Sequence, residues 1–89
     1  MTDITEDTSN NELYLTALGQ AIRDIRANTH MSQEEVSHDA GIAVSYYAKI
    51  EAGSINTSVK KLRVIAAALG VSVGQMTTQA DNIYNSNSK

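Results

Sequence analysis

The chain has 89 residues, no cysteine and only two histidines, which limits it to one small domain, excludes disulfides and argues against a structural metal site. No apolar run approaches the roughly 18 residues of a transmembrane helix and the first residues are acidic, so we expect a cytoplasmic protein with no membrane partner. The net charge of −3 comes from four acidic residues among the first twelve, and the near-neutral remainder excludes a broad basic surface.

The N-terminal residues are polar, acidic and without periodicity, and we expect a disordered arm over residues 1–9. Ser9 and Glu12 have the spacing of a capping box, so a first helix should begin near Asn10. Its predicted buried face, at helical spacing, is Leu13, Ala17, Leu18, Ala21, Ile22 and Ile25. Gly19 interrupts this helix at a cost of about 1 kcal/mol in helix propensity, so we expect a neighbouring helix to approach closely there.

Residues 31–53 contain two short helical patterns separated by a turn. Ser32 and Glu35 have the spacing of another capping box, at the start of the first pattern. Gly41 is suited to the left-handed conformation that ends a helix, and Gly53 is placed to end the second pattern in the same way. Two helices of about two turns each, joined by a short turn that contains glycine, are typical of a helix-turn-helix unit.

A fourth helical pattern is the most hydrophobic segment of the chain. Thr57 or Ser58 can cap it, and Gly70 ends it. Its apolar residues predict a central buried helix with a face made of Val59, Leu62, Ile65, Ala66 and Leu69.

A fifth pattern begins after Ser72, which can cap it. It either continues to about Tyr84 or frays, so residues 79–89 are expected to be a C-terminal tail or a helix extension. No strand pattern is present. The predicted fold is therefore all-α, a compact five-helix bundle whose domain spans residues 10–78.

Three motifs at their observed spacings resemble the Cro/C1-type helix-turn-helix domain, also called the XRE family, of phage and bacterial repressors. They are Ser32-Gln33-Glu34-Glu35, Lys49-Ile50-Glu51-x-Gly53 and Ala66-x-x-Leu69-Gly70-Val71. The resemblance spans residues of about 15–77. It implies a lambda-repressor-like domain in a bacterial or phage-encoded transcription regulator, a repressor, that binds double-stranded DNA without a cofactor, metal or small-molecule ligand.

The resemblance also implies which side chains meet the DNA. The third helix, over residues of about 43–52, would enter the major groove, with base-reading positions at Ala43, Val44, Ser45 and Lys49. Lys49 can donate to O6 and N7 of guanine, whereas Val44 has no polar group and can only pack on a thymine methyl. A phosphate contact is the alternative role for Lys49.

Other residues would hold the DNA backbone or the protein frame. The implied phosphate contacts are Gln33, Tyr46, Asn56, Thr57, Ser58, Lys60 and Lys61, some through side chains and some beside free N–H groups at helix starts. For the two lysines, solvated surface charge is the alternative. Arg26 and Glu51 match a structural ion pair that braces the first helix against the third.

Two positions depart from the family pattern. Ala43 stands where the family usually has Ser or Thr, which loses a helix cap worth about 0.5–2 kcal/mol. Val44 stands where Arg or Gln often follows. This apolar tip indicates either a thymine-rich site or a shift from DNA towards protein contacts. The alternative function is therefore a protein-interaction module on the same fold, such as an antitoxin or accessory subunit. No nucleophile–base set, metal cluster or phosphate-binding glycine loop indicates an enzyme.

A single domain of this kind offers few cations to DNA. We therefore expect a homodimer that binds a pseudo-palindromic operator with half-sites about 34 Å apart. The candidate dimer surface is residues 73–84, because Ile83 and Tyr84 lie beyond the expected core.

Overall fold

The computed structural model describes the backbone of residues 4–87 and the side chains of residues 11–87. Five α-helices and no strand occur in this range, which confirms the predicted all-α fold. The helices are α1 (Ile4–Asn28), α2 (Gln33–Ala40), α3 (Val44–Glu51), α4 (Val59–Leu69) and α5 (Val73–Asn87). None of these described helices is long and apolar enough to cross a membrane.

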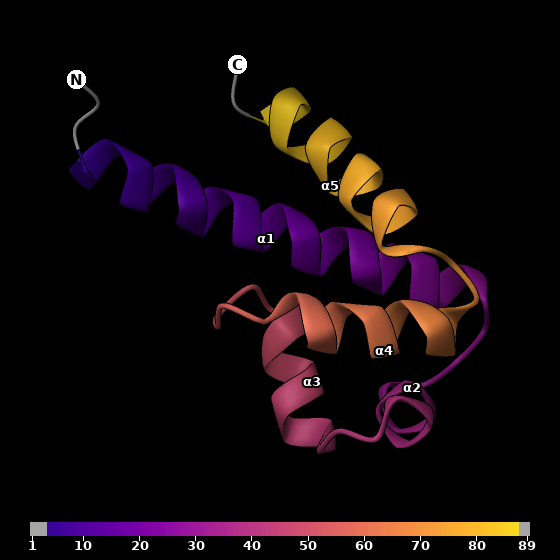
Figure 1. Ribbon diagram of the computed structural model, residues 1–89. Coiled ribbons are helices and arrows are strands. Elements are labelled where there is room, and N and C mark those ends of the chain that lie inside the picture. The colour runs from indigo at the N-terminus through magenta and orange to yellow at the C-terminus, as the bar shows by residue number, and fades with distance from the viewer. Residues whose placement is uncertain (1–3, 88–89) are drawn as a thin grey trace.

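The longest helix, α1, crosses the molecule, and the other helices are arranged around it (Figure 1). α5 packs along α1 on one side, and α3 contacts α1 on the other. α2 packs against both α3 and α4. In this view α2 and the start of α3 form the lower edge of the molecule, away from the end at which both termini emerge.

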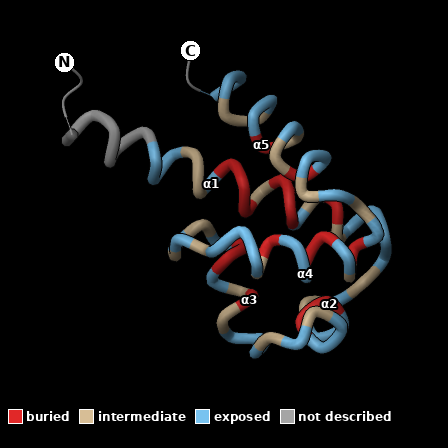
Figure 2. Tube along the Cα trace, viewed as in Figure 1, coloured by how far each residue is buried: buried red, intermediate tan, exposed pale blue. Residues whose placement is uncertain are grey.

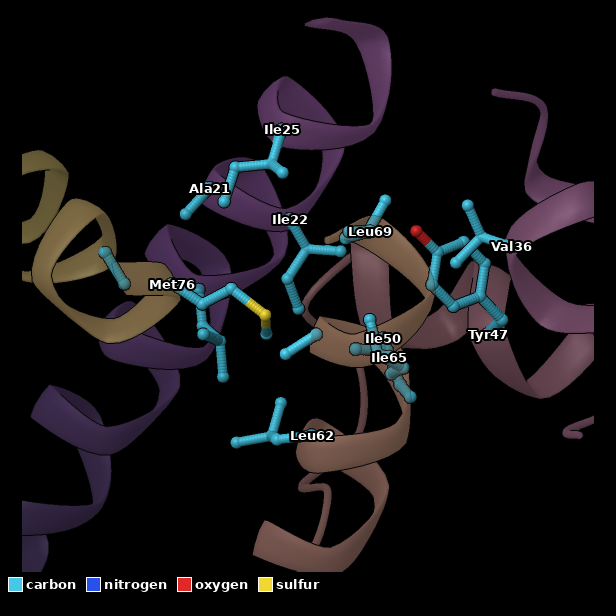
Figure 3. Close-up of a cluster of buried hydrophobic side chains, with 13 residues drawn as sticks. Ala21, Ile22, Ile25, Val36, Tyr47, Ile50, Leu62, Ile65, Leu69 and Met76 are labelled. Atoms are coloured by element: carbon cyan, nitrogen blue, oxygen red, sulfur yellow. The ribbon is translucent and has the colours of Figure 1, made fainter. Parts of the chain in front are cut away.

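The core is one cluster of buried side chains to which every helix contributes (Figure 3). Its largest fully buried members, each less than 2% exposed, come one from each helix in turn: Ile22, Val36, Tyr47, Ile65 and Met76. Complete burial of a large apolar side chain stabilises a fold by about 1.5–3 kcal/mol. The buried stretches face inwards on all five helices (Figure 2), so no helix is held by local propensity alone.

Local hydrogen bonds fix where three of the helices begin. The Ser32 hydroxyl accepts from the Glu35 backbone N–H at 3.0 Å, and the Glu35 carboxylate accepts from the Ser32 N–H at 2.7 Å. The same reciprocal pair joins Ser72 and Gln75 at the start of α5. At α4 the cap is Ser58, whose hydroxyl accepts from the Lys61 N–H at 3.1 Å. The predicted capping box at Ser32 is therefore confirmed.

The first helix is longer than the sequence suggested. α1 begins at Ile4 rather than near Asn10, so the helix includes residues 4–9, which the sequence analysis gave to the N-terminal arm. Ser9 lies inside the helix instead of capping it. A helix that is already nucleated extends at little cost, and no proline or glycine interrupts this stretch. Residues 1–3 lie outside the described part of the chain.

The fifth helix also continues past the expected end of the domain, to Asn87. Ala80 is fully buried, and the Tyr84 ring packs edge-to-face on Tyr14 with ring centroids 5.7 Å apart. The Tyr14 hydroxyl donates to the Asp81 carboxylate at 2.8 Å. Burial, together with this hydrogen bond, raises the pKa of Tyr14 to about 12. The predicted tail is thus a helix extension packed on α1, and only its last two residues lie outside the described part.

Several side chains differ in exposure from the prediction. Leu13 is 55% exposed and Val59 is 67% exposed, although both were expected on buried faces. Val59 is the first residue of α4, and Leu13 lies before the buried stretch of α1 begins at Ala17. Conversely, Ile83, which was expected beyond the core, packs against the core and is half-buried, as is Tyr84.

The backbones of α1 and α3 come into direct contact at Gly19. A Cβ atom at this position would lie 2.3 Å from the Glu51 carbonyl oxygen and 2.7 Å from that of Ile50. Gly53, just after α3, has a left-handed φ of +72° and would place a Cβ 2.7 Å from the Thr16 Cα. The predicted close approach at Gly19 is confirmed, and it sets the end of α3 against the middle of α1.

An ion pair closes the same junction. Arg26 Nε donates to Glu51 Oε2 at 2.6 Å and Nη2 donates to Oε1 at 3.1 Å. Arg26 Nη1 also donates to the Met31 carbonyl oxygen at 2.9 Å, and the Gln33 amide donates to Glu51 Oε1 at 3.0 Å. Burial by itself would raise the pKa of Glu51, but the hydrogen bonds from Arg26 and its other neighbours lower it below the ordinary 4.5. One carboxylate therefore ties α1, α2 and α3 together.

The substitution Gly19→Ala tests the contact between α1 and α3. We expect it to lower the free energy of unfolding by about 1–3 kcal/mol or more, because the new methyl group would overlap carbonyl oxygens of α3. Urea denaturation followed by circular dichroism measures the change. Gly74→Ala is the matched control, because its Cβ would meet only the Ser72 hydroxyl at 3.7 Å. Equal stability of the two variants would contradict the close approach.

The substitution Glu51→Gln tests the ion pair. It should lower the free energy of unfolding by about 3 kcal/mol at pH 7, because Arg26 loses its buried partner. Folding lowers the pKa of Glu51, so its contribution is complete above pH 4.5 and is lost as the pH falls through the folded-state pKa. Urea titrations in a pH series should therefore show the wild-type advantage narrowing below about pH 4.5. An advantage that stays constant down to strong acid would contradict the pairing.

Candidate functional site

The turn between α2 and α3 is built from local conformations that the sequence imposes. Gly41 adopts the left-handed conformation at φ +73°, and its N–H donates to the carbonyl oxygens of Ser37 and His38. Ala43 then returns to an extended conformation and starts α3. Beneath the turn, Val36 and Tyr47 lie next to each other in the core (Figure 3). The two helices are therefore held as one unit with fixed orientation.

The four predicted base-reading residues lie together on the outer side of this unit. We call them the α3 edge: Ala43, Val44, Ser45 and Lys49 are all exposed, whereas the opposite side of the helix is buried. In Figure 2 the tube is coloured as exposed over most of the turn and at the start of α3. Among the described residues, neither the Ser45 hydroxyl nor the Lys49 ammonium has a protein partner. Ala43 provides no side-chain cap, so the predicted loss of that cap is confirmed.

Two residues that the sequence assigned to phosphate contacts have internal partners. Gln33 is half-buried, and its amide donates to Glu51. The amide group carries two N–H bonds, so one remains available. Tyr46 is half-buried. It packs against the core, and the Lys61 ammonium lies over its ring, 5.2 Å from the ring centroid. This cation–π contact joins α3 to α4, a role that the sequence did not indicate.

The start of α4 brings further predicted residues beside the turn. A recess of about 260 Å³ lies between the turn and α4 and is lined by Ala40, Gly41, Ile42, Ser58, Lys60, Lys61 and Val64. Asn56 precedes α4 and is exposed. Thr57 is half-buried, and its hydroxyl oxygen is buried with no hydrogen-bond partner among the residues that the structure describes. Val64 was not singled out from the sequence, although it follows Lys60 by one helical turn and so shares its face.

The local charge of this surface differs from that of the whole chain. The α3 edge and the recess together carry three lysines and no acidic residue, although the chain has a net charge of −3. The nearest carboxylate in sequence, Glu51, is buried and neutralised by Arg26. An exposed helix edge with cations and hydroxyl donors beside it can enter a groove of a polyanion and contact the negative charges along that groove.

Comparison with known proteins places most of this chain in one family. The Helix-turn-helix family matches residues 22–76. The immunity repressor protein of Bacillus phage phi105 is 36% identical over 56 residues, which cover 63% of this chain and 39% of the repressor. The control protein C.BamHI of Bacillus amyloliquefaciens is 37% identical over 54 residues, 60% of this chain and 67% of that protein. The crystal structure of the clp gene regulator ClgR from Corynebacterium glutamicum superposes with a TM-score of 0.82 and 25% identity, covering 84% of this chain and 80% of that chain.

The matched segment contains the whole α2–α3 unit, the start of α4 and the Arg26–Glu51 pair. This chain spans less than half the length of the phage immunity repressor that it resembles. The family is one of DNA-binding regulators and not of enzymes. The chain belongs to the helix-turn-helix family of the Cro/C1, or XRE, type.

Proposed function

We propose that this protein is a sequence-specific DNA-binding transcription regulator, a repressor, that inserts α3 into the major groove. The observation that carries the proposal is the exposed α3 edge, which contains Lys49 and lies beside Lys60 and Lys61 of the recess, with no acidic residue in either the edge or the recess. An α-helix with its side chains is about 10–12 Å across, which matches a major groove about 12 Å wide. An immunity repressor, a control protein and a gene regulator among the relatives support the regulatory role.

The proposed contacts fall into two groups. Ser45 and Lys49 are one helical turn apart on the same side of α3 and would donate to base edges, with Ala43 and Val44 making apolar contacts. The proposed phosphate contacts are Gln33, through its second amide N–H, and Tyr46, Asn56, Thr57, Ser58, Lys60 and Lys61. Lys61 would reach the DNA backbone from its position over the Tyr46 ring. Its contact with this ring limits the positions of its ammonium group.

We further propose that the active form is a homodimer. Three lysines beside one short helix give little electrostatic affinity, and two linked half-sites multiply it. Most of α5 packs on α1. We therefore place the proposed contact with a second copy where α1 and α5 meet at the surface, rather than over residues 73–84. There Leu13 is 55% exposed beside a shallow apolar groove of about 80 Å³ that it forms with Thr16, Ala17, Tyr84 and Asn87.

Selection of bound sequences from random double-stranded DNA tests the function directly. We expect one preferred sequence with two-fold symmetry, bound with an affinity that falls as salt concentration rises. The alternative, a protein-interaction module, is favoured by the apolar tip of the α3 edge. Recovery of no preferred sequence would overturn the proposed function and support that alternative.

The substitution Lys49→Ala tests the α3 edge as the base-reading surface. It should reduce discrimination between the selected and scrambled sequences by about 1–3 kcal/mol, because one base loses its donor. Lys60→Ala is the matched control and should weaken binding to both sequences alike. The slope of the logarithm of the binding constant against the logarithm of the salt concentration should become smaller in magnitude by about one. Fluorescence anisotropy at several salt concentrations measures both effects. Full discrimination by Lys49→Ala would remove Lys49 as a base reader.

The substitution Leu13→Glu tests the dimer surface. A carboxylate placed beside the apolar groove should convert the dimer to monomers in sedimentation velocity, because the charge would have to be buried in the contact. Affinity for an operator with two half-sites should then fall towards that for one half-site. Val59→Glu changes an even more exposed apolar residue, on α4, and should leave the dimer intact. Dissociation by Val59→Glu alone would place the contact on α4 instead.

A further inference from the structure

The tip of the α3 edge is an exposed apolar side chain. Val44 is the first residue of α3 and is 41% exposed, one of four large hydrophobic residues that the described part of the chain leaves at its surface. The other three, Leu13, Val59 and Val64, lie on α1 and α4. Val44 is therefore the apolar group that α3 itself presents to a partner.

The residues around Val44 leave its side chain free to make contact. Ala43 and Ser45, on either side, are exposed and smaller, so Val44 is the largest of these three side chains. Ala43 has no side-chain oxygen, and no side-chain hydrogen bond caps α3. Ahead of Ser45, the side chains of the α3 edge are therefore hydrocarbon only.

The charge around this hydrocarbon identifies its partner. Lys49 on the same edge and the lysines of the recess are cationic, and no acidic residue accompanies them. A partner must therefore combine closely spaced negative charges with a small apolar group. The major groove of DNA meets both requirements, because phosphates line it and the 5-methyl group of thymine is its apolar feature.

We propose that Val44 packs on a thymine methyl in each half-site and makes thymine a preferred base at one position there. This inference rests on the proposed function, because it requires α3 to lie in the major groove. Deoxyuridine lacks only that methyl group and keeps every hydrogen-bonding atom of thymine. Loss of one buried methyl should weaken binding about fourfold. Replacement in both half-sites should weaken it by about the square of that factor.

The experiment uses the operator recovered by selection, with deoxyuridine substituted for thymidine at one symmetric position at a time. Fluorescence anisotropy gives the Kd of wild type, Val44→Ala and Val59→Ala for each duplex. Wild type should show one symmetric position at which deoxyuridine weakens binding. Val44→Ala should bind the two duplexes equally at that position. Val59→Ala, which alters an exposed valine on α4 outside the recess, should keep the wild-type difference.

The outcomes separate the inference from the proposed function. A preferred operator with no methyl-sensitive position, or with a sensitivity that persists in Val44→Ala, would overturn the role of Val44 and leave the DNA-binding function standing. Failure to recover any preferred sequence would overturn the proposed function and this inference with it. Sensitivity to the thymine methyl that disappears in Val44→Ala and persists in Val59→Ala would establish the contact.

Discussion

The position of α3 depends on the contact between its last turn and the middle of α1. Gly19 lets the two backbones meet, and a side chain of any size would push them apart. The Arg26–Glu51 pair then closes the junction and includes α2 through Gln33. Because a buried ion pair gives little net stability against apolar packing, its main physical effect here is to fix orientation. The exposed edge of α3 takes its direction from this buried junction.

The junction also accounts for the charge of the surface. Glu51 is the acidic residue nearest to the α3 edge in sequence, and the fold buries it and neutralises it with Arg26. The lysines of α3 and α4 are thereby left without an exposed carboxylate among them, in a chain whose net charge is negative. A weakly cationic surface of this kind favours recognition by fitted contacts over long-range attraction. The same weakness is the reason for proposing two linked copies, which would multiply the affinity.

Because Ala43 provides no cap, the stability of α3 comes from tertiary contacts rather than from hydrogen bonds at its start. A helix of eight residues is not stable alone in water, and this one lacks the hydrogen bond that begins α2, α4 and α5. Burial of Tyr47 and Ile50 holds it instead, along with the contact of Tyr46 beneath Lys61. The start of the helix is thus free of side-chain hydrogen bonds and open to a partner.

The number of helices, the boundaries at Ser32 and Gly41, and the core positions of Tyr47 and Ile50 follow from the sequence, because caps, glycines and apolar spacing act over one or two turns. The ion pair and the exposed positions of the α3 edge were implied by the resemblance to a known family. Only the tertiary structure decided that α5 extends along α1, that Leu13 is exposed, and that Gln33 and Tyr46 have internal partners. Each of these depends on a residue from another helix, and local spacing carries no information about which distant side chain will lie opposite.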